Sequence, residues 1–480
     1  MLANCVIAII ATTSLSPLYS TASAFVVLPA PTSRGTSLFP KVHHRRIDDK
    51  GRPLHMVSSA LKEENNEKEE HPNPVLQQLL LSTKVLHPRQ ISYKPHIKKV
   101  RFVSDIHTDH DNNWKWAETL RPDPSALLIV AGDVSHDEET IRQTLKVLLT
   151  KFGAVSYTPG NHDLWVVDQT AEKNAQEEQE QEEQGRIQDS VQKLVSLLRL
   201  CEEIGVETGI LRIGETNQNG LWVAPILSWH HQSFDNEPDI DPNAWGRIPS
   251  VEKLVADYRR ARWPTPLSQR DDSVARFMDD INDYILGDSE EASSSSPSSS
   301  SPSSSSWMDS DDAPLLTFSH FVPRIELTPE KRYMTFPTLN KAVGSDFLER
   351  RLRRMGSSFH VFGHTHFGWD MEIDGIRYVQ ASLAYPREWE YRARSLSLGT
   401  MSEENDFQPV CVWEEDPTGQ SNGFPNVVLG GYWSDRYYHV DRKPDIVDTL
   451  PPWNARRFKQ LQNGKIEDYV RHQSSRFDKF

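Results

Sequence analysis

The sequence predicts an α/β fold, and two observations support that prediction. First, apolar runs that suit buried strands alternate with helical spacing, as in residues 126–131, 138–152 and 154–158. This strand–helix–strand rhythm predicts parallel strands joined by a right-handed crossover. Second, short polar motifs directly follow several of the apolar runs. Because ligands in open α/β sheets bind at the carboxyl ends of strands, these motifs are expected to converge on one site.

The predicted elements follow one another from residue 97 to residue 386. Strands are expected near residues 100–105, 126–131, 154–158, 221–227, 315–318 and 359–362. Helices are expected over residues 138–152, 191–204 and 345–355, and in several pieces over 251–286. Continuous apolar runs such as residues 126–131 fit strands that are buried on both faces. Residues 372–379 are predicted to form a hairpin, because Asp374-Gly375 favours a tight turn.

The segments outside this domain differ from it in composition. We expect a signal peptide over residues 1–24, a transit-peptide-like segment over 25–57, a linker over 58–95, a single folded domain over 96–455 and a basic tail over 456–480. Within the domain, residues 288–312 are rich in Ser and Pro, cannot bury a core and are expected to form a disordered insert. The insert interrupts the domain without ending it, because an apolar strand resumes at Leu315.

The first 57 residues predict a cellular address. An apolar core at residues 6–11 is too short to span a bilayer, and the small residues after it end at Ala24-Phe25, where a signal peptide would be cleaved. The next segment is basic and nearly free of acidic residues, as in transit peptides. Together they resemble the bipartite plastid presequence of diatoms and similar algae, which implies a plastid location. Plain secretion is the alternative.

The composition argues against several classes of protein. A net charge of −15 argues against a general nucleic-acid binder, because phosphate backbones require a basic face. No stretch of the predicted mature chain is long and apolar enough to span a bilayer. Three cysteines are too few for a disulfide framework. The sequence leaves the oligomeric state open.

Five polar motifs together contain the ligands of a metal site. They are Asp105-Ile106-His107, Gly132-Asp133, Gly160-Asn161-His162-Asp163, Ser319-His320 and Gly363-His364-Thr365-His366. Carboxylate, imidazole and amide oxygen all suit a borderline or hard divalent cation. Asp105 and His107 are two residues apart, so on an extended segment they share a face and can hold one ion together. One such motif is a weak signal, whereas five in order predict a shared site.

The motifs and their order resemble the calcineurin-like metallophosphoesterase superfamily over residues 98–386. The resemblance implies two packed mixed β-sheets flanked by helices, with a dinuclear metal site at the carboxyl ends of the strands. It implies that one ion binds Asp105, His107, Asp133 and His366, and that the other binds Asp133, Asn161, His320 and His364. These ligands suit two divalent or trivalent ions, with manganese, iron and zinc all compatible.

The resemblance also implies hydrolysis of a phosphate monoester or diester by a hydroxide shared between the two ions. Two ions lower the pKa of water and clamp the phosphoryl oxygens. His162 is expected over the substrate, where it assists the leaving group. Asp163 is expected to orient His162 and keep it cationic. The alternatives are a non-catalytic scaffold on the same fold and a hydrolase of nucleotide pyrophosphate linkages.

The chain differs from two branches of the superfamily, and these differences narrow the group that it resembles. The protein Ser/Thr phosphatases continue their Gly-Asp motif with Val-Asp-Arg-Gly and have Glu after the catalytic His, whereas this chain has Val134-Ser135-His136 and Asp163. Purple acid phosphatases place a Tyr ligand where this chain has His136. The chain therefore resembles the broad, bacterial-type group of the superfamily.

Four further side chains could act either at the site or elsewhere on the protein. His230 and His231 follow a predicted strand, and either reach the mouth of the site or have an exposed polar role. Arg324 and Arg387 follow motif-bearing strands, and either bind phosphate or form surface salt bridges.

Overall fold

The computed structural model describes residues 73–455, except residues 84, 89, 167–186, 216–219, 246–247, 287–312, 397, 399–406, 417, 419–420, 427 and 453. The predicted signal peptide, the transit-peptide-like segment, the Ser/Pro-rich insert and the basic tail lie outside the described residues. Those four assignments remain predictions.

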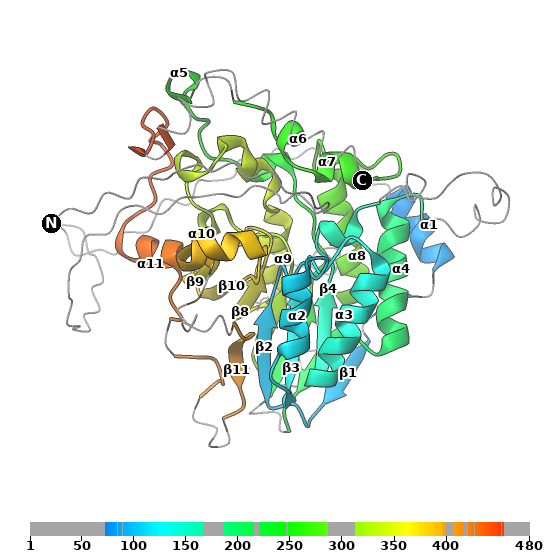
Figure 1. The fold of residues 1–480 in the computed structure, drawn as a ribbon. Helices are drawn as coiled ribbons and strands as arrows, with labels where there is room; N and C mark the ends of the chain where they lie inside the picture. Colours follow the sequence, from blue (N-terminus) through cyan, green and yellow to red (C-terminus); the bar gives the residue numbers. More distant parts are fainter. Residues whose placement is uncertain are drawn as a thin grey trace, which may run out of the picture.

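Two mixed β-sheets flanked by helices form the architecture, as predicted (Figure 1). The larger sheet contains, in spatial order, β1 (Ile91–Lys94), β5 (Ile210–Ile213), β6 (Leu221–Pro225), β7 (Leu315–Phe318), β8 (Phe359–Phe362), β10 (Ile376–Ala381) and β9 (Gly368–Ile373). The smaller sheet contains β11 (Val410–Glu414), β2 (Lys99–Val103), β3 (Asp123–Ala131) and β4 (Phe152–Thr158). Strands β2, β3 and β4 are parallel, as are β6, β7, β8 and β10. The predicted hairpin is the antiparallel pair β9–β10.

The core of the molecule has two layers, and strand β3 contributes to both. Leu127 and Ile129 belong to an apolar cluster that also contains residues of β6, β7, β8 and β10, so this cluster joins the two sheets. Leu128 and Val130 point to the opposite face, into the cluster that contains the helices. This alternation explains why β3 is apolar at successive positions, as expected for a strand buried on both faces.

Helices cover the outer face of the smaller sheet. Figure 1 shows α2 (Asp111–Thr119), α3 (Glu138–Lys151) and α4 (Ser190–Ile204) side by side next to β3 and β4. Helix α3 begins where Asp137 accepts a hydrogen bond from the Thr140 N–H, and it buries Ile141 and Leu145 at helical spacing. Helix α4 ends at Gly205, whose φ of 81° suits a residue without a Cβ.

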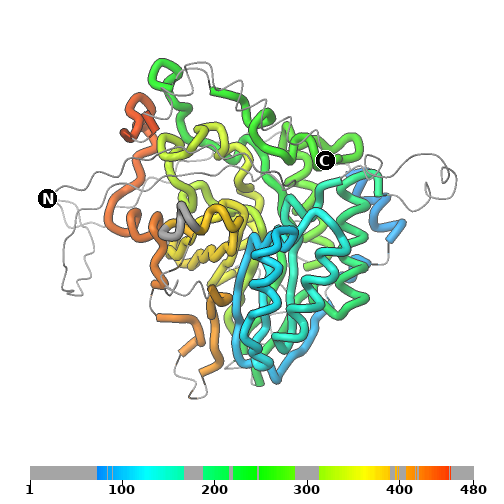
Figure 2. The backbone as a smooth tube through the Cα atoms, viewed as in Figure 1, coloured from blue at the N-terminus to red at the C-terminus, as the bar shows by residue number. Residues whose placement is uncertain are grey.

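The remaining helices lie around the larger sheet and beyond the strand ends. They are α1 (Pro74–Ser82), α5 (Pro242–Trp245), α6 (Val251–Leu254), α7 (Asp257–Arg260), α8 (Ser273–Leu286), α9 (Asp346–Met355), α10 (Pro386–Leu396) and α11 (Tyr432–His439). Figure 2 shows the chain between β6 and α8 and the chain between β7 and α9 gathered at the top of the view, above the strands. Among the described residues, no helix has the length and apolar character needed to cross a membrane.

The folded part begins earlier than the sequence indicated. Residues 58–95 were predicted to be a linker, but α1 and β1 lie within this range. Strand β1 extends the larger sheet, with Ile91 opposite Ile210 of β5, and α1 buries Leu79 against the core. A four-residue edge strand is too short to show a period in the sequence, and β1 is defined by its partner strand.

Candidate metal centre

The backbone adopts an unusual conformation at five of the seven predicted ligands. The φ angles are 51° at Asp105, 38° at His107, 56° at Asp133, 74° at His364 and 54° at His366. A positive φ is uncommon for residues other than glycine and costs on the order of 1–3 kcal/mol. Neighbouring main chains hold two of these residues in place, because Asp105 N–H donates to the Gly132 carbonyl and His107 N–H to the Asp133 carbonyl, both at 3.0 Å. Strain of this kind concentrates at functional sites.

The second and third motifs approach each other so closely that only glycine fits between them. A Cβ atom at Gly132 would lie 2.6 Å from the Gly160 nitrogen and 2.6 Å from His320 Nδ1. A Cβ atom at Gly160 would lie 2.2 Å from Asp133 Oδ1. These glycines therefore let three strand ends bring their polar side chains into one space.

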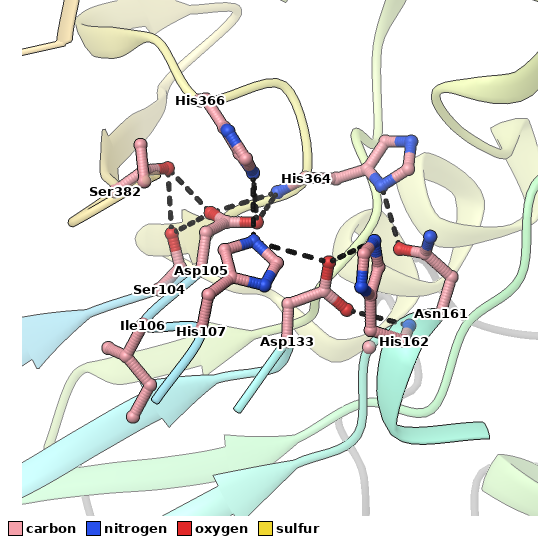
Figure 3. Close-up of polar contacts among 12 residues, drawn as sticks. Ser104, Asp105, Ile106, His107, Asp133, Asn161, His162, His364, His366 and Ser382 are labelled. Carbon is pink, nitrogen blue, oxygen red and sulfur yellow. Dashed lines mark hydrogen bonds and ion pairs between the residues drawn. The ribbon is translucent and has the colours of Figure 1, made fainter. Parts of the chain in front are cut away.

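The first group of candidate ligands consists of Asp105, His107 and His366, and all three are buried. Their ligand atoms lie within 4.8 Å of one another. His107 Nε2 is 3.2 Å from His366 Nε2, and His366 Nε2 is 3.5 Å from Asp105 Oδ1 (Figure 3). Two imidazole nitrogens and a carboxylate oxygen thus face a common point.

The second group consists of Asp133, His320 and His364, and Asn161 joins it. Asn161 Oδ1 lies 2.9 Å from His320 Nε2 and 3.0 Å from His364 Nδ1. Asp133 lies between the groups, with Oδ1 3.4 Å from His320 Nε2 and Oδ2 4.0 Å from His107 Nε2. The structure therefore brings all seven predicted ligands together.

The histidine tautomers fit a cation at each group. Three of the rings use one nitrogen to donate an N–H hydrogen bond away from the ligand groups. The bonds run from His320 Nδ1 to the Ala131 carbonyl at 2.9 Å, from His364 Nε2 to the Ala342 carbonyl at 2.8 Å, and from His366 Nδ1 to Glu388 Oε2 at 2.7 Å. These tautomers are assigned from the hydrogen-bond network. Since each N–H is used there, the second nitrogen of each ring presents a lone pair to the ligand group when the ring is neutral. A cation satisfies these converging acceptors.

The charges within the site also favour a bound cation. Burial, followed by the charges of Asp163 and Asp105, raises the pKa of Asp133 well above its usual value, so its ionised form requires a nearby positive charge. Burial lowers the pKa of His364 to about 3 and keeps that ring in the neutral form that binds metals. Burial opposes the protonation of His366, but Glu388 and Asp105 raise its pKa to about 9, so an ion at this group must displace the Nε2 proton of His366.

The side chains that hold the first group in place lie outside the five motifs. Ser104 and Ser382 both donate through Oγ to Asp105 Oδ2 at 2.5 Å (Figure 3). Glu388, in α10, accepts the hydrogen bond from His366 Nδ1. Ser104 adjoins a motif and could have been suggested by the sequence, whereas nothing local marks Ser382 or Glu388.

His162 lies beside the ligand groups with its ring held by two aromatic residues. The ring stacks on Trp165 with centroids 3.7 Å apart, and its Nε2 lies 3.4 Å from the Tyr385 hydroxyl. The same Nε2 is 3.8 Å from Asp133 Oδ2. Burial, followed by the neighbouring His107, lowers the pKa of His162 well below its usual value. The ring is therefore neutral in the metal-free protein, which differs from the cationic state that the sequence suggested.

The expectation that Asp163 orients His162 is wrong. The two carboxylate oxygens of Asp163 accept four backbone N–H groups at 2.8–3.1 Å, from Asp133, Val134, Ser135 and Gly160. Three of these N–H groups follow Gly132 and the fourth lies in the third motif, so the Asp163 carboxylate holds the two loops together. Asp163 therefore stabilises the loop that carries Asp133, and the aromatic residues orient His162.

The structure distinguishes between the two interpretations given above for each of two histidines and two arginines. His230 and His231 are both buried, so neither has an exposed role, and His230 Nε2 lies 3.3 Å from Asp257 Oδ2. Arg324 forms ion pairs with three acidic side chains: Glu326, Glu349 and Asp374. Arg387 lies over the ring of Tyr385 at 5.8 Å from its centroid, beside the site.

The fold and the site together define a metal-dependent phosphoesterase. The sequence pattern of the calcineurin-like phosphoesterase family matches residues 98–368, which is more than half of the chain, so the chain belongs to this family. It is a metallophosphoesterase, and its family hydrolyses phosphate esters with bound metal.

The chain is similar in sequence and in structure to individual proteins of known name. The acyl-carrier-protein phosphodiesterase PptH of Mycobacterium tuberculosis is 25% identical to this chain over 297 residues, which cover 60% of this chain and 79% of that protein. The crystal structure of phosphopantetheinyl hydrolase (PptH) from Mycobacterium tuberculosis matches 66% of this chain and 96% of its own, with 20% identity and a TM-score of 0.43.

Proposed function

We propose that this chain hydrolyses a phosphate ester with two metal ions held by the seven converging side chains. One ion is assigned to Asp105, His107, Asp133 and His366, and the other to Asp133, Asn161, His320 and His364. The main supporting observation is the position of Asp133, whose two oxygens face different ligand groups. When bound, two ions supply a water of lowered pKa and offset the charge of the phosphoryl group.

His162 is assigned to the leaving group. Its Nε2 faces the Asp133 oxygen that lies between the ligand groups. An anionic phosphate ester bound there raises the pKa of the ring, and the protonated ring can then donate a proton to the ester oxygen. Trp165 holds the plane of the ring, and the Tyr385 hydroxyl lies 3.4 Å from Nε2. Both contacts position the donor before the substrate arrives, which lowers the entropic cost of the step.

The complete ligand set favours an enzyme over a non-catalytic scaffold on the same fold. A scaffold has no need for five strained residues and three oriented imidazoles in one buried space, because each strained residue destabilises the fold. Hydrolysis of nucleotide pyrophosphate linkages uses the same metal chemistry and remains within the scope of the test below.

A substrate panel tests the proposal. The purified folded chain, reconstituted with manganese, iron or zinc, is assayed on an aryl phosphate monoester, an aryl phosphodiester and a nucleotide pyrophosphate. We expect hydrolysis of at least one substrate, abolition by a chelator, recovery with added metal and about two ions per chain by elemental analysis. Undiminished turnover by fully metal-stripped protein would contradict the two-metal assignment.

The similarity to PptH favours one particular substrate class. We propose a phosphodiester as the preferred linkage, specifically the ester that joins a phosphopantetheinyl group to an acyl carrier protein. Hydrolysis would release the phosphopantetheine arm from the carrier protein, and mass spectrometry of the carrier protein detects that loss. A chain that cleaves aryl phosphodiesters but leaves the modified carrier intact would refute this substrate and leave the general proposal standing.

The plastid location is also proposed, on the composition of residues 1–57 alone. A fluorescent protein fused after Ser59 should accumulate in the plastid of a diatom-like host, and Phe25→Ala should redirect it. Fluorescence of the unaltered fusion in the medium or endoplasmic reticulum would support secretion instead.

A further inference from the structure

Asp257 is a buried carboxylate outside the ligand set that contacts both parts of the proposed machinery. It is the first residue of α7, and its side chain has an exposed fraction of 0%. Its Oδ1 accepts hydrogen bonds from Asn161 Nδ2 and from Trp165 Nε1, each at 2.8 Å. Its Oδ2 lies 3.3 Å from His230 Nε2. One carboxylate oxygen thus joins a metal ligand to the residue on which His162 stacks.

The contact with Asn161 determines which end of the amide faces the second ligand group. An amide has an oxygen acceptor and an NH₂ donor of similar shape, and rotation by half a turn exchanges them. Because Asp257 accepts from Nδ2, Oδ1 is directed toward His320 and His364. The reversed amide would present hydrogen atoms to a cation and would leave Asp257 facing an acceptor.

The contact with Trp165 determines the position of the indole ring. The same Asp257 oxygen holds the indole N–H, and the His162 ring stacks on the indole with an interplanar angle of 28°. The main chain supports this arrangement, because Val166 N–H donates to the Arg260 carbonyl of α7 at 2.9 Å. Movement of Asp257 would therefore shift the surface that supports His162.

We propose that Asp257 is a positioning residue that orients the Asn161 amide toward the second ion and, through Trp165, the His162 ring toward the leaving group. This inference rests on the proposed two-metal function. It adds a link between the two tasks: one buried side chain couples metal binding to proton donation. Outer partners of metal ligands typically change metal affinity or activity by roughly 10- to 100-fold when they are replaced.

The first experiment compares metal binding by titration of the metal-stripped full chain. Asp257→Asn retains the volume but loses the charge, and it should weaken the second of two binding events by roughly 10- to 100-fold while sparing the first. Asp346→Asn is the matched control, because Asp346 also pairs with a histidine, His231, at 2.8 Å, but is partly exposed. It should bind both ions like the native chain.

A double-mutant cycle shows whether Asp257 acts through Asn161. In an Asn161→Ala background, Asp257→Asn should have little further effect on the second binding event, because its target is already lost. An equal effect in both backgrounds would overturn the Asn161 part of the inference. A native chain that binds no metal would refute the proposed function itself, whereas native-like binding by Asp257→Asn would refute only the inference.

A second variant tests the Trp165 contact, and it keeps the inference testable if Asp257→Asn does not fold. Trp165→Phe preserves an aromatic ring beside His162 but removes the indole N–H. We expect kcat to fall about tenfold with KM and metal content unchanged, and with a larger loss for substrates with poor leaving groups. Native kcat and leaving-group dependence in this variant would overturn the His162 part of the inference.

Discussion

The histidines of the two ligand groups are held in place by different kinds of partner. Side chains support the first group, where Glu388 orients His366 and two serine hydroxyls bind Asp105. Main-chain carbonyls support the histidines of the second group, at Ala131 for His320 and at Ala342 for His364. A side-chain partner can be removed by one substitution, whereas a carbonyl moves only with its chain segment. The histidine orientation in the first group should therefore be easier to disrupt selectively by mutation than that in the second.

The second group depends on the conformation of a long connection. Ala342 ends the 3₁₀ helix Pro337–Ala342, which lies between β7 and α9. Val322 fixes the end of this segment, because its N–H donates to the Val343 carbonyl and its carbonyl accepts from Ser345 N–H, both at 3.0 Å. The orientation of the His364 ring thus depends on the conformation of residues 322–345.

Asp133→Asn should have the largest effect, because Asp133 is the side chain shared by both groups. We expect activity to fall by more than roughly 100-fold, beyond the range typical of outer partners, together with weaker binding of both ions. Activity assays and elemental analysis provide the measurement. Two retained ions with near-normal turnover would show that the groups do not share this ligand.

His162→Ala should lower kcat by roughly 100-fold or more without loss of metal, since proton donation by a positioned side chain contributes about 10²–10⁴-fold. The loss should shrink for substrates with very acidic leaving groups. An equal loss across leaving groups would indicate stabilisation of transition-state charge instead. Loss of metal would place His162 among the ligands, as its proximity to His107 and Asp133 allows.

Glu388→Gln tests the side-chain support of the first group. We expect the affinity for one ion to fall by about 10- to 100-fold while the other ion binds normally, because only His366 loses its charged partner. Glu372→Gln is a suitable control, since Glu372 is exposed on β9. Equal weakening of both ions in a metal titration would contradict the separation of the two groups.

Gly344→Ala tests the main-chain support of the second group. A Cβ atom at Gly344 would lie 2.1 Å from the Val322 carbonyl oxygen, so the segment that carries Ala342 must shift. Overpacking costs about 1–3 kcal/mol, and we expect roughly tenfold weaker binding of the second ion. Preserved binding of that ion in a folded variant would show that the carbonyl contact is dispensable.

Arg387→Ala should produce the smallest effect. Arg387 is exposed beside Tyr385, so we expect KM to rise by roughly two- to fivefold, consistent with about 1 kcal/mol or less for an exposed charge. Arg324→Ala is the control and should leave KM unchanged, because Arg324 is paired with acidic residues. Equal KM values for the two variants would remove Arg387 from substrate binding.

The sequence by itself determined the strands that precede the ligands, the order of the ligands and their meeting at the strand ends, whereas β1, β5 and β11 were not predicted. This was possible because burial imposes apolar runs on the strands, and because ligand motifs such as Asp105-Ile106-His107 are contiguous. Leu127 and Leu128 are an example, because they are adjacent apolar residues that are buried on opposite faces of the same strand.

Only the tertiary structure decided which residues support the ligands. Glu388 is 22 residues from His366, and Asp257 is 96 residues from Asn161, so no local pattern joins either pair. Asp163 shows the converse, because adjacency in the sequence suggested a contact with His162 that the turn of the backbone does not make. Short-range patterns report burial and conformation, whereas the partner of a buried polar atom depends on which loops the fold brings together.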